Sequence, residues 1–210
     1  METTTSYIIA ILSNGTRTII TNKNENMHYD SNYSIEEKFD VILTDGNDHE
    51  LALKTIKNNP DAISIIDAGS LKEGTVLLCH NVTYVVCSND FAKEYTKINF
   101  SYDDIERIKK VYDILVNDFQ TNVVMTLESY GSFTKINGEY VLVPSIKVEC
   151  LDSTGAGDIY HGAFTYFISH GYSLYDTLKL SNIAGALSVL KIGSKASMPQ
   201  LSQVLDYHVQ

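Results

Sequence analysis

The sequence has few cysteines and no apolar run of the length that a membrane span requires. Its three cysteines, Cys79, Cys87 and Cys150, are widely spaced and odd in number, which predicts buried, reduced thiols rather than a disulfide framework. Residues 1–6 are rich in Thr and lack the basic-then-apolar order of a signal peptide. These absences lead us to expect a cytoplasmic protein that does not enter a membrane.

Positive charge is also scarce. The chain carries 16 Lys and Arg residues against 26 Asp and Glu residues, a formal net charge of −10. This excess of negative charge argues against binding to nucleic acid or to an anionic membrane surface. A phosphate group on any ligand would therefore have to be held by a local device rather than by the general field of the protein.

What the sequence does contain is an alternation of short apolar strands and helical stretches, with no internal repeat. We expect strands at 40–44, 62–67, 84–87 and 122–127, and a strand pair at 132–136 and 139–143. We expect helices at 48–58, 71–80, 90–96, 101–119, 159–170, 173–191 and 199–207. This order predicts an α/β fold with a mostly parallel sheet covered by helices on both faces.

Residues 6–21 differ from the rest because their two strands are joined directly. The turn dipeptide Asn14-Gly15 lies between two apolar runs, which is typical of a β-hairpin. We therefore divide the chain into a small hairpin, 1–24, and an α/β domain, 25–210. Ser34 and Glu37 have the spacing of a capping box, which predicts a brief helical turn between these units.

The stretch with the most chemical information is Asp152-Ser153-Thr154-Gly155-Ala156-Gly157-Asp158. It stands between an apolar strand pattern and a helical run. In that order the amides of Gly155, Ala156 and Gly157 lie at a helix N-terminus without intrahelical partners. Unpaired donors at the positive end of a helix dipole form an anion site, and the glycines let a ligand approach the backbone.

Asp158 falls in the first turn of that helix, beside the expected anion site. A carboxylate in this position could take a proton from a hydroxyl that attacks a phosphorus atom. The structural alternative is that Asp158 only complements the helix dipole and that the glycines only form a tight turn. We favour the functional interpretation because all seven residues occur in the strand–turn–helix context.

Polar side chains also follow the expected strands at the edge where ligands of parallel sheets bind. Each of them has an alternative interpretation as a turn former or a helix cap. The residues are Asp45, Asp67, Asn89, Thr126 and Asp158.

The seven-residue stretch, with Tyr160, Gly162, Ala163 and Phe164 after it, resembles the C-terminal signature of the ribokinase-like, or PfkB, carbohydrate kinases. The resemblance covers essentially the whole chain. Residues 14–19 resemble the family's lid strand, residues 124–131 its nucleotide-side turn, and residues 194–199 its usual C-terminal end. It implies a three-layer ribokinase-like fold with a small β lid hairpin, and ATP-dependent phosphorylation of a sugar hydroxyl.

The resemblance also implies a role for individual residues. Asp158 would be the base, and the amides of Gly155, Ala156 and Gly157 would hold the transferring phosphoryl group. The residues implied near the nucleotide are Asn89, at its phosphates, Thr126, Glu128 and Gly131, and Asn182 at the adenine. Arg17 and Asp45 are the candidate substrate contacts, although an exposed hairpin arginine is an equally good interpretation of Arg17.

The cofactors implied are ATP with Mg²⁺, and in some relatives K⁺, for which Asp152 and Thr154 are the matching positions. The lid strands of relatives often pair between subunits, so a homodimer through residues 1–24 is implied. Ala92 stands where many members have the Glu that organises magnesium, and Glu128 replaces a common glycine.

The family's leading segment, with its Gly-Gly motif and sugar-binding residues, has no counterpart in this sequence. We therefore expect an N-terminally truncated domain with a bare sheet edge. Three functions remain open: a sugar kinase, a non-catalytic remnant that binds nucleotide or a partner chain, and a kinase for a nucleoside or vitamin hydroxyl. The sugar itself cannot be identified from these residues.

Overall fold

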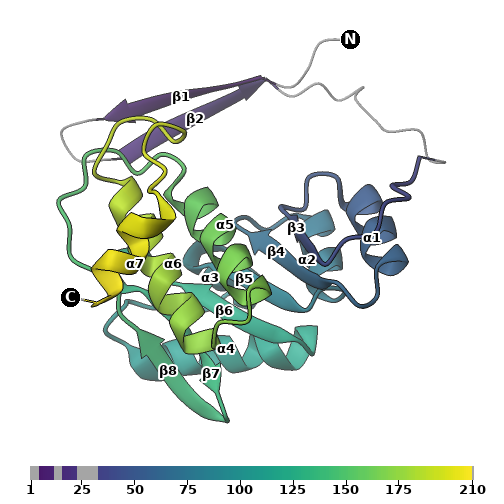
Figure 1. Ribbon diagram of the computed structural model, residues 1–210. Helices are drawn as coiled ribbons and strands as arrows, with labels where there is room; N and C mark the ends of the chain where they lie inside the picture. The colour runs from purple at the N-terminus through teal and green to yellow at the C-terminus, as the bar shows by residue number, and fades with distance from the viewer. Residues whose placement is uncertain (1–4, 12–15, 23–32, 210) are drawn as a thin grey trace.

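The computed structural model describes residues 5–11, 16–22 and 33–209 (Figure 1). Its strands are β1 (Thr5–Ile11), β2 (Thr16–Asn22), β3 (Val41–Thr44), β4 (Ile63–Ala68), β5 (Tyr84–Ser88), β6 (Asn122–Thr126), β7 (Ser132–Ile136) and β8 (Glu139–Val143). Its helices are α1 (His49–Asn58), α2 (Glu73–Cys79), α3 (Asn89–Thr96), α4 (Ile105–Phe119), the short 3₁₀ helix η1 (Glu128–Tyr130), α5 (Ala156–Ser169), α6 (Leu174–Ser188) and α7 (Leu201–Val209).

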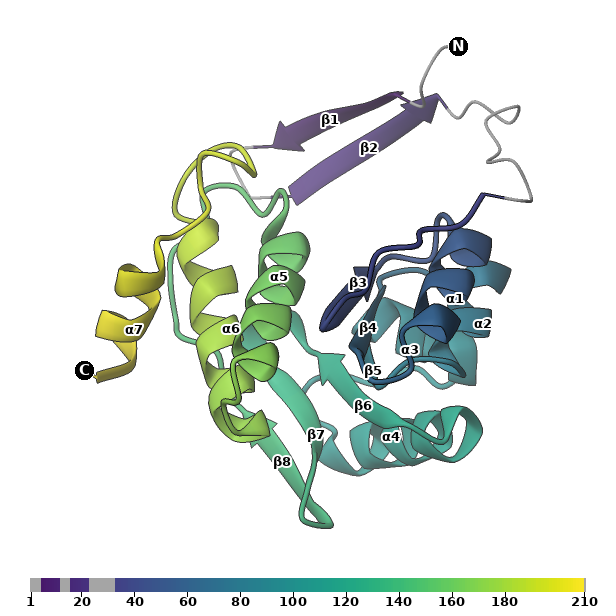
Figure 2. The same ribbon diagram turned by 45° about the vertical axis from the view of Figure 1, so that its right-hand side comes forward.

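The strands β3 to β8 form one sheet in chain order. The pairs from β3 to β6 are parallel, whereas β7 and β8 are antiparallel to their neighbours. Figure 2 shows α1 to α4 on one side of this sheet and α5, α6 and α7 on the other. The predicted three-layer α/β fold with a mostly parallel sheet is confirmed.

Alternation along the strands supplies both halves of the core. In β5, Val85 and Cys87 pack toward α2, α3 and α4, whereas Val86 packs toward α5 and α6. All three side chains are fully buried. A central parallel strand is covered on both faces, so it is apolar at successive positions rather than at every second one.

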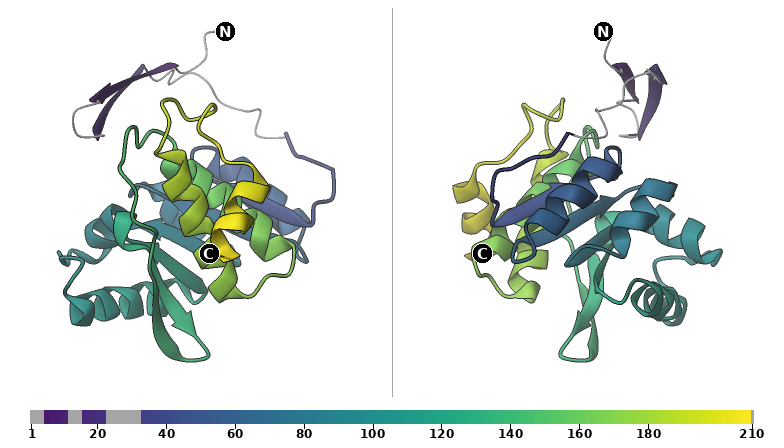
Figure 3. Two further views of the ribbon diagram at one scale, coloured as in Figure 1. Left: turned by 60° about the vertical axis from the view of Figure 1, so that its left-hand side comes forward. Right: turned by 90° about the vertical axis from the view of Figure 1, so that its right-hand side faces the viewer.

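The hairpin forms a separate two-stranded antiparallel sheet, in which Ile8 pairs with Ile19. Both views of Figure 3 show it above the rest of the molecule. The two predicted strands are confirmed, while the turn at Asn14-Gly15 lies outside the described residues.

Three local predictions were wrong. Residues 34–37 form no helical turn, although Ser34 does hydrogen-bond to Glu36. Helix α4 begins four residues later than expected because the Asp104 side chain caps it by accepting from the amide of Arg107. Cys150 is exposed rather than buried; all three cysteines are free thiols.

Strand β3 is an edge of the six-stranded sheet within the described residues, and its Leu43 side chain is exposed. The carboxyl end of β3 lies close to α5 in space, and residues of both elements line one cavity. Across residues 5–11, 16–22 and 33–209, no helix combines the length and apolar character that a bilayer span needs.

Candidate active site

The turn into α5 exposes backbone donors. Gly155 is the N-cap residue with φ +77°, a left-handed conformation that favours glycine, and a Cβ there would lie 2.5 Å from Ser194. Within the described part of the chain, the amides of Gly155 and Gly157 have no hydrogen-bond partner; that of Ala156 makes a long turn bond to Ser153 at 3.3 Å. A Cβ on Gly157 would meet nothing within 4 Å. Two of the three predicted donors, the amides of Gly155 and Gly157, are therefore without a partner among the described residues.

Asp152 fixes this turn from behind. Its carboxylate is buried and accepts from the amides of Thr154 and Gly193, both at 2.9 Å. The amides of Leu151 and Asp152 donate to Val189. These bonds join the segment before α5 to the segment after α6, and we call them the Asp152 latch.

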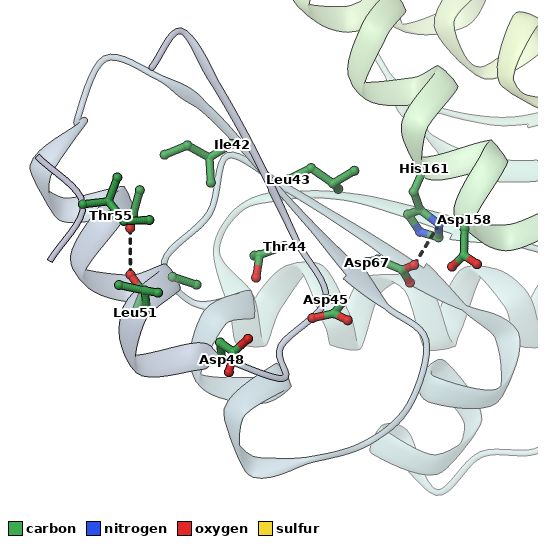
Figure 4. A pocket seen from close by; sticks show the side chains of 12 residues that line it. Ile42, Leu43, Thr44, Asp45, Asp48, Leu51, Thr55, Asp67, Asp158 and His161 are labelled. Atoms are coloured by element: carbon green, nitrogen blue, oxygen red, sulfur yellow. Dashed lines mark hydrogen bonds and ion pairs between the residues drawn. The ribbon is translucent and has the colours of Figure 1, made fainter. Parts of the chain in front are cut away.

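Four carboxylates lie around a cavity of about 410 Å³ between β3, β4, α1 and α5. They belong to Asp45, Asp48, Asp67 and Asp158, and His161 is the only basic residue among the lining residues that the structure describes. We call this space the carboxylate cavity. Figure 4 shows Asp45, Asp67, Asp158 and His161 around one region at the carboxyl ends of the strands.

Asp158 is exposed and borders a second space as well. This cavity of about 500 Å³ lies between α5, α6, α7 and residues 194–199, and Gly155 and Asp158 are part of its lining. Among the residues that the structure describes, none donates a hydrogen bond to the Asp158 carboxylate. The side chain expected to be the base is thus open to two neighbouring spaces.

His161 was not anticipated as a site residue. It lies one turn after Asp158 on α5, is buried, and its Nδ1 is 3.2 Å from Oδ2 of Asp67 at the end of β4 (Figure 4). The only sequence signal for it was its i+3 spacing from Asp158, which places both side chains on one face of the helix.

The environment of Asp67 disfavours its charged form. Burial raises the pKa of Asp67, the charges of Asp158 and Asp45 raise it further, and His161 opposes them. A carboxyl with a raised pKa beside an exposed carboxylate is typical of functional sites.

A second group of predicted residues lies around the end of β6 and the start of β7, and we call it the β6–β7 corner. It contains Asn89, Thr126, Glu128, Gly131 and Asn182.

Asn182 is buried, and both ends of its amide are used inside the protein. Its oxygen accepts from Ser132 at 2.8 Å and its nitrogen donates to the carbonyl of Val143 at 2.9 Å. Ser132 also bonds to the Tyr160 hydroxyl at 2.7 Å. Asn182 lines neither of the two cavities, so its polar atoms join α6 to the sheet.

Thr126 and Asn89 are engaged as well. The Thr126 hydroxyl donates to the carbonyl of Cys87 at 3.3 Å, and the Asn89 side chain hydrogen-bonds to the Tyr102 hydroxyl. Burial raises the pKa of Tyr102, and its hydrogen bond to Glu128 adds to that effect. The three residues Asn89, Tyr102 and Glu128 are therefore connected.

Backbone geometry explains which residue types residues 128 and 131 can be. Glu128 has φ +51° and Gly131 has φ +115°. A Cβ on Gly131 would overlap the carbonyl oxygen of Val143. Gly131 is thus required by the fold, and Glu128 adopts a conformation that glycine adopts at less cost.

The remaining predicted residues are placed as follows. Asp45 lines the carboxylate cavity and accepts hydrogen bonds from Asn47. The backbone of Arg17 pairs with Ala10 in the hairpin. Ala92 is fully buried in α3.

The fit of the implied cations differs between the two ions. The described residues contain no group of three or more His, Cys, Asp or Glu side chains placed to hold a metal. Mg²⁺ commonly binds through substrate phosphates, water and one or two carboxylates, which does not require such a group. For a monovalent cation, the buried Thr154 hydroxyl finds no hydrogen-bond partner among the described residues, and the Thr154 amide belongs to the Asp152 latch.

Comparison with known proteins agrees with the fold. The model of the pfkB family carbohydrate kinases matches residues 1–201. The chain is similar to ribokinase from Schizosaccharomyces pombe, with 41% identity over 83 residues, which are 39% of this chain and 26% of the relative. Ribokinase from Lactococcus lactis subsp. lactis is 32% identical over 90 residues, 43% of this chain and 30% of the relative.

Solved structures match more of the chain. A ribokinase-type structure from Agrobacterium tumefaciens aligns with 99% of this chain and 68% of its own, with TM-score 0.85 and 23% identity. Arabidopsis thaliana ribokinase, solved with ribose and ATP, aligns with 96% of this chain and 67% of its own, with TM-score 0.74 and 21% identity. At these identities the structures show the fold. The stretches matched in the two relatives span less than a third of their length.

Proposed function

The chain belongs to the pfkB family of carbohydrate kinases, and on that premise we propose that it transfers the γ-phosphoryl group of ATP to a sugar hydroxyl. In this proposal Asp158 accepts the hydroxyl proton. The amides of Gly155, Ala156 and Gly157 hold the transferring phosphoryl group. Phosphoryl transfer depends mainly on positioning and charge stabilisation, which a set of this kind supplies.

One observation carries the proposal: the open amides at the start of α5 and the exposed Asp158 carboxylate lie in the same helical turn. The amides of Gly155 and Gly157 have no partner within the described residues, and Asp158 lines both cavities. An anion at the amides and a hydroxyl in the carboxylate cavity would meet at Asp158. This is the arrangement that in-line transfer requires.

The nucleotide is proposed to lie toward the β6–β7 corner. The exposed Glu128 and the buried Gly131 and Asn182 would shape this region, with Thr126 beside them and Asn89 toward the phosphates. Because Asn182 and Thr126 are hydrogen-bonded within the protein, we assign them a positioning role. Neighbouring groups that they orient would contact the nucleotide.

Mg²⁺ would enter with the ATP phosphates and neutralise their charge. Asp152 and Thr154 are proposed to hold a K⁺ ion, to which the Thr154 hydroxyl would offer an oxygen that is otherwise without a partner. Bound there, a monovalent cation would stabilise the turn that carries the amides.

Arg17 and Asp45 are proposed to contact the acceptor. Carboxylates bind sugar hydroxyls by accepting their hydrogen bonds. Asp45 belongs to a cavity that offers several such acceptors, which supports a polyhydroxylated substrate. A homodimer through the hairpin strands is proposed on the resemblance alone.

The direct test is ATP-dependent phosphorylation of a panel of sugars and nucleosides by the wild-type chain and by Asp158→Asn. The wild type should release ADP, and Asp158→Asn should lose at least about 10³-fold of kcat because the base is gone. Its melting temperature should stay within about 2 °C, since an exposed side chain is changed. Asp61→Asn, at an exposed carboxylate that lines neither cavity, is the matched control and should keep its activity.

Retained turnover in Asp158→Asn would contradict the proposal. If the wild-type chain forms no ADP while ATP still raises its melting temperature, the alternative is supported: a non-catalytic, nucleotide-binding member of the family.

A further inference from the structure

His161 is surrounded by hydrogen-bond acceptors. Its Nδ1 is 2.7 Å from the carbonyl oxygen of Gly157 and 3.2 Å from Oδ2 of Asp67. Its Nε2 is 3.2 Å from the carbonyl oxygen of Val86 on β5. The side chain is 7% exposed, so water does not replace these partners.

A neutral imidazole has one N–H donor and one nitrogen lone pair. With the proton on Nε2, the Nδ1 lone pair would face the Gly157 oxygen at 2.7 Å. With the proton on Nδ1, the Nε2 lone pair would face the Val86 oxygen. Either tautomer leaves a buried lone pair against an oxygen, whereas an imidazolium donates from both nitrogens.

The charges around His161 favour the same form. Asp67 on β4 is the nearest acid, Asp158 lies one turn earlier on α5, and Asp45 follows β3. Tyr160 contributes a ring edge at 5.7 Å, and its hydroxyl bonds to Ser132 instead. Among the described residues that line the carboxylate cavity, His161 is the one basic side chain.

We propose that His161 is held as an imidazolium and is the positioning residue that fixes the first turn of α5 to the ends of β4 and β5. One N–H binds the Gly157 carbonyl within the turn that carries the open amides, and it also faces Asp67. The other binds Val86. The same cation lies 3.2 Å from Asp67 in the cavity that Asp158 also lines, and there it offsets the charge of the two acids. Its consequence for the rate rests on the proposed function; its charge state does not.

The charge state can be measured on the full-length wild-type protein labelled with ¹⁵N-histidine. Long-range ¹H–¹⁵N correlation spectra should show both His161 nitrogens protonated at about pH 7, as donors to the Gly157 and Val86 carbonyl oxygens. The signals are assigned by their loss in His161→Gln. His170, the exposed C-cap residue of the same helix, gives a separate signal that serves as the internal reference.

A second variant tests the cause without removing the ring. Asp67→Asn should lower the pH at which His161 loses a proton, because its nearest negative charge is gone. A wild-type His161 with one unprotonated nitrogen at about pH 7, or one that Asp67→Asn leaves unchanged, would overturn the inference. If His161→Gln does not fold, the assignment can be taken from Asp67→Asn, since only His161 should shift.

The kinetic consequence is a loss of kcat of about 10- to 100-fold in His161→Gln with less than about threefold change in the KM for ATP, because the phosphoryl-holding turn loses its orientation. His170→Gln should stay within about twofold of wild type. An inactive wild type with a doubly protonated His161 would reject the proposed function and keep this inference; an active wild type with a neutral His161 would do the reverse.

Discussion

The carboxylate cavity and the β6–β7 corner use their polar groups in opposite ways. In the corner, the polar side chains form hydrogen bonds with other protein groups, as seen for Asn182, Thr126 and Asn89. In the cavity, Asp158 is exposed and accepts no hydrogen bond from the described residues. Motif positions of one family can therefore build the framework in one region and line an open cavity in another.

The same contrast holds for the glycines. Gly131 has no room for a Cβ, whereas Gly157 is surrounded by open space. We expect changes in the corner to lower stability and changes near the cavity to lower activity. The following experiments test that division, beginning with the largest expected effect.

Gly131→Ala should destabilise the protein by at least about 3 kcal/mol, because the added Cβ overlaps the Val143 carbonyl and φ is +115°. Urea unfolding followed by circular dichroism measures this. The matched change is Gly157→Ala, which should alter the free energy of unfolding by less than about 0.5 kcal/mol while impairing phosphoryl transfer. Equal losses of stability in the two variants would remove the distinction between the glycines.

Asn182→Ala should cost about 2 kcal/mol of stability, since the buried carbonyl of Val143 loses its amide donor and Ser132 loses an acceptor. Asp48→Asn, an exposed position beside the cavity, should cost less than about 0.5 kcal/mol. Thermal denaturation of both variants under one set of conditions is sufficient. If Asn182→Ala left stability unchanged, the internal hydrogen bonds of this amide would not be needed for folding, and a role in ligand binding would be favoured.

Asp67 should give the cavity a pH-dependent cost in stability. Its folded pKa is raised above the ordinary 3.8, chiefly by burial, so the folded state binds this proton more tightly than the unfolded state does. The contribution of Asp67 to the free energy of unfolding should therefore fall as the pH rises from about 4. Denaturation of wild type and Asp67→Asn between about pH 4 and 6 should show the wild type losing its advantage. If the stability of the wild type relative to Asp67→Asn instead increased with pH, the pKa of Asp67 would be lowered in the folded state, not raised.

The smallest effect is expected from Glu128→Gly. Glycine relieves the strain of φ +51°, but it also gains freedom in the unfolded chain and gives up the hydrogen bond to Tyr102. We expect a change of no more than about 0.5 kcal/mol in either direction, measured as a shift in melting temperature. A loss above about 1 kcal/mol would show that the contact with Tyr102 outweighs the backbone strain.

Much of this molecule was predictable because its signals are local. The strand, the glycine turn and the helix around Gly155 follow one another directly, so the sequence alone placed open amides and Asp158 in one turn. The antiparallel pair around Asn137-Gly138 was predictable for the same reason: both residues have the positive φ that a tight hairpin turn needs.

What was missed depends on contacts between distant segments. His161 faces Asp67 and Val86 because α5 packs across the ends of β4 and β5, and no spacing in the sequence encodes that. The hydrogen bonds of Asn182 to Ser132 and to the Val143 carbonyl also join distant segments, and no sequence spacing indicates them. Ser34 and Glu37 have the letters of a capping box, but the side chain of Ser34 bonds to Glu36 and residues 34–37 form no helical turn.

The Asp152 latch affects what proteolytic cleavage after α6 would do to the molecule. The carboxylate of Asp152 holds Gly193, and Val189 accepts from residues 151 and 152, so α5 and α6 are clasped at their open ends as well as joined at residues 170–173. After trypsin cuts at the exposed Lys191, the Asp152–Gly193 hydrogen bond and the packing of Val204 against α6 would still hold the two pieces together. The nicked molecule should elute as a single species, with the turn at Gly155 still in shape.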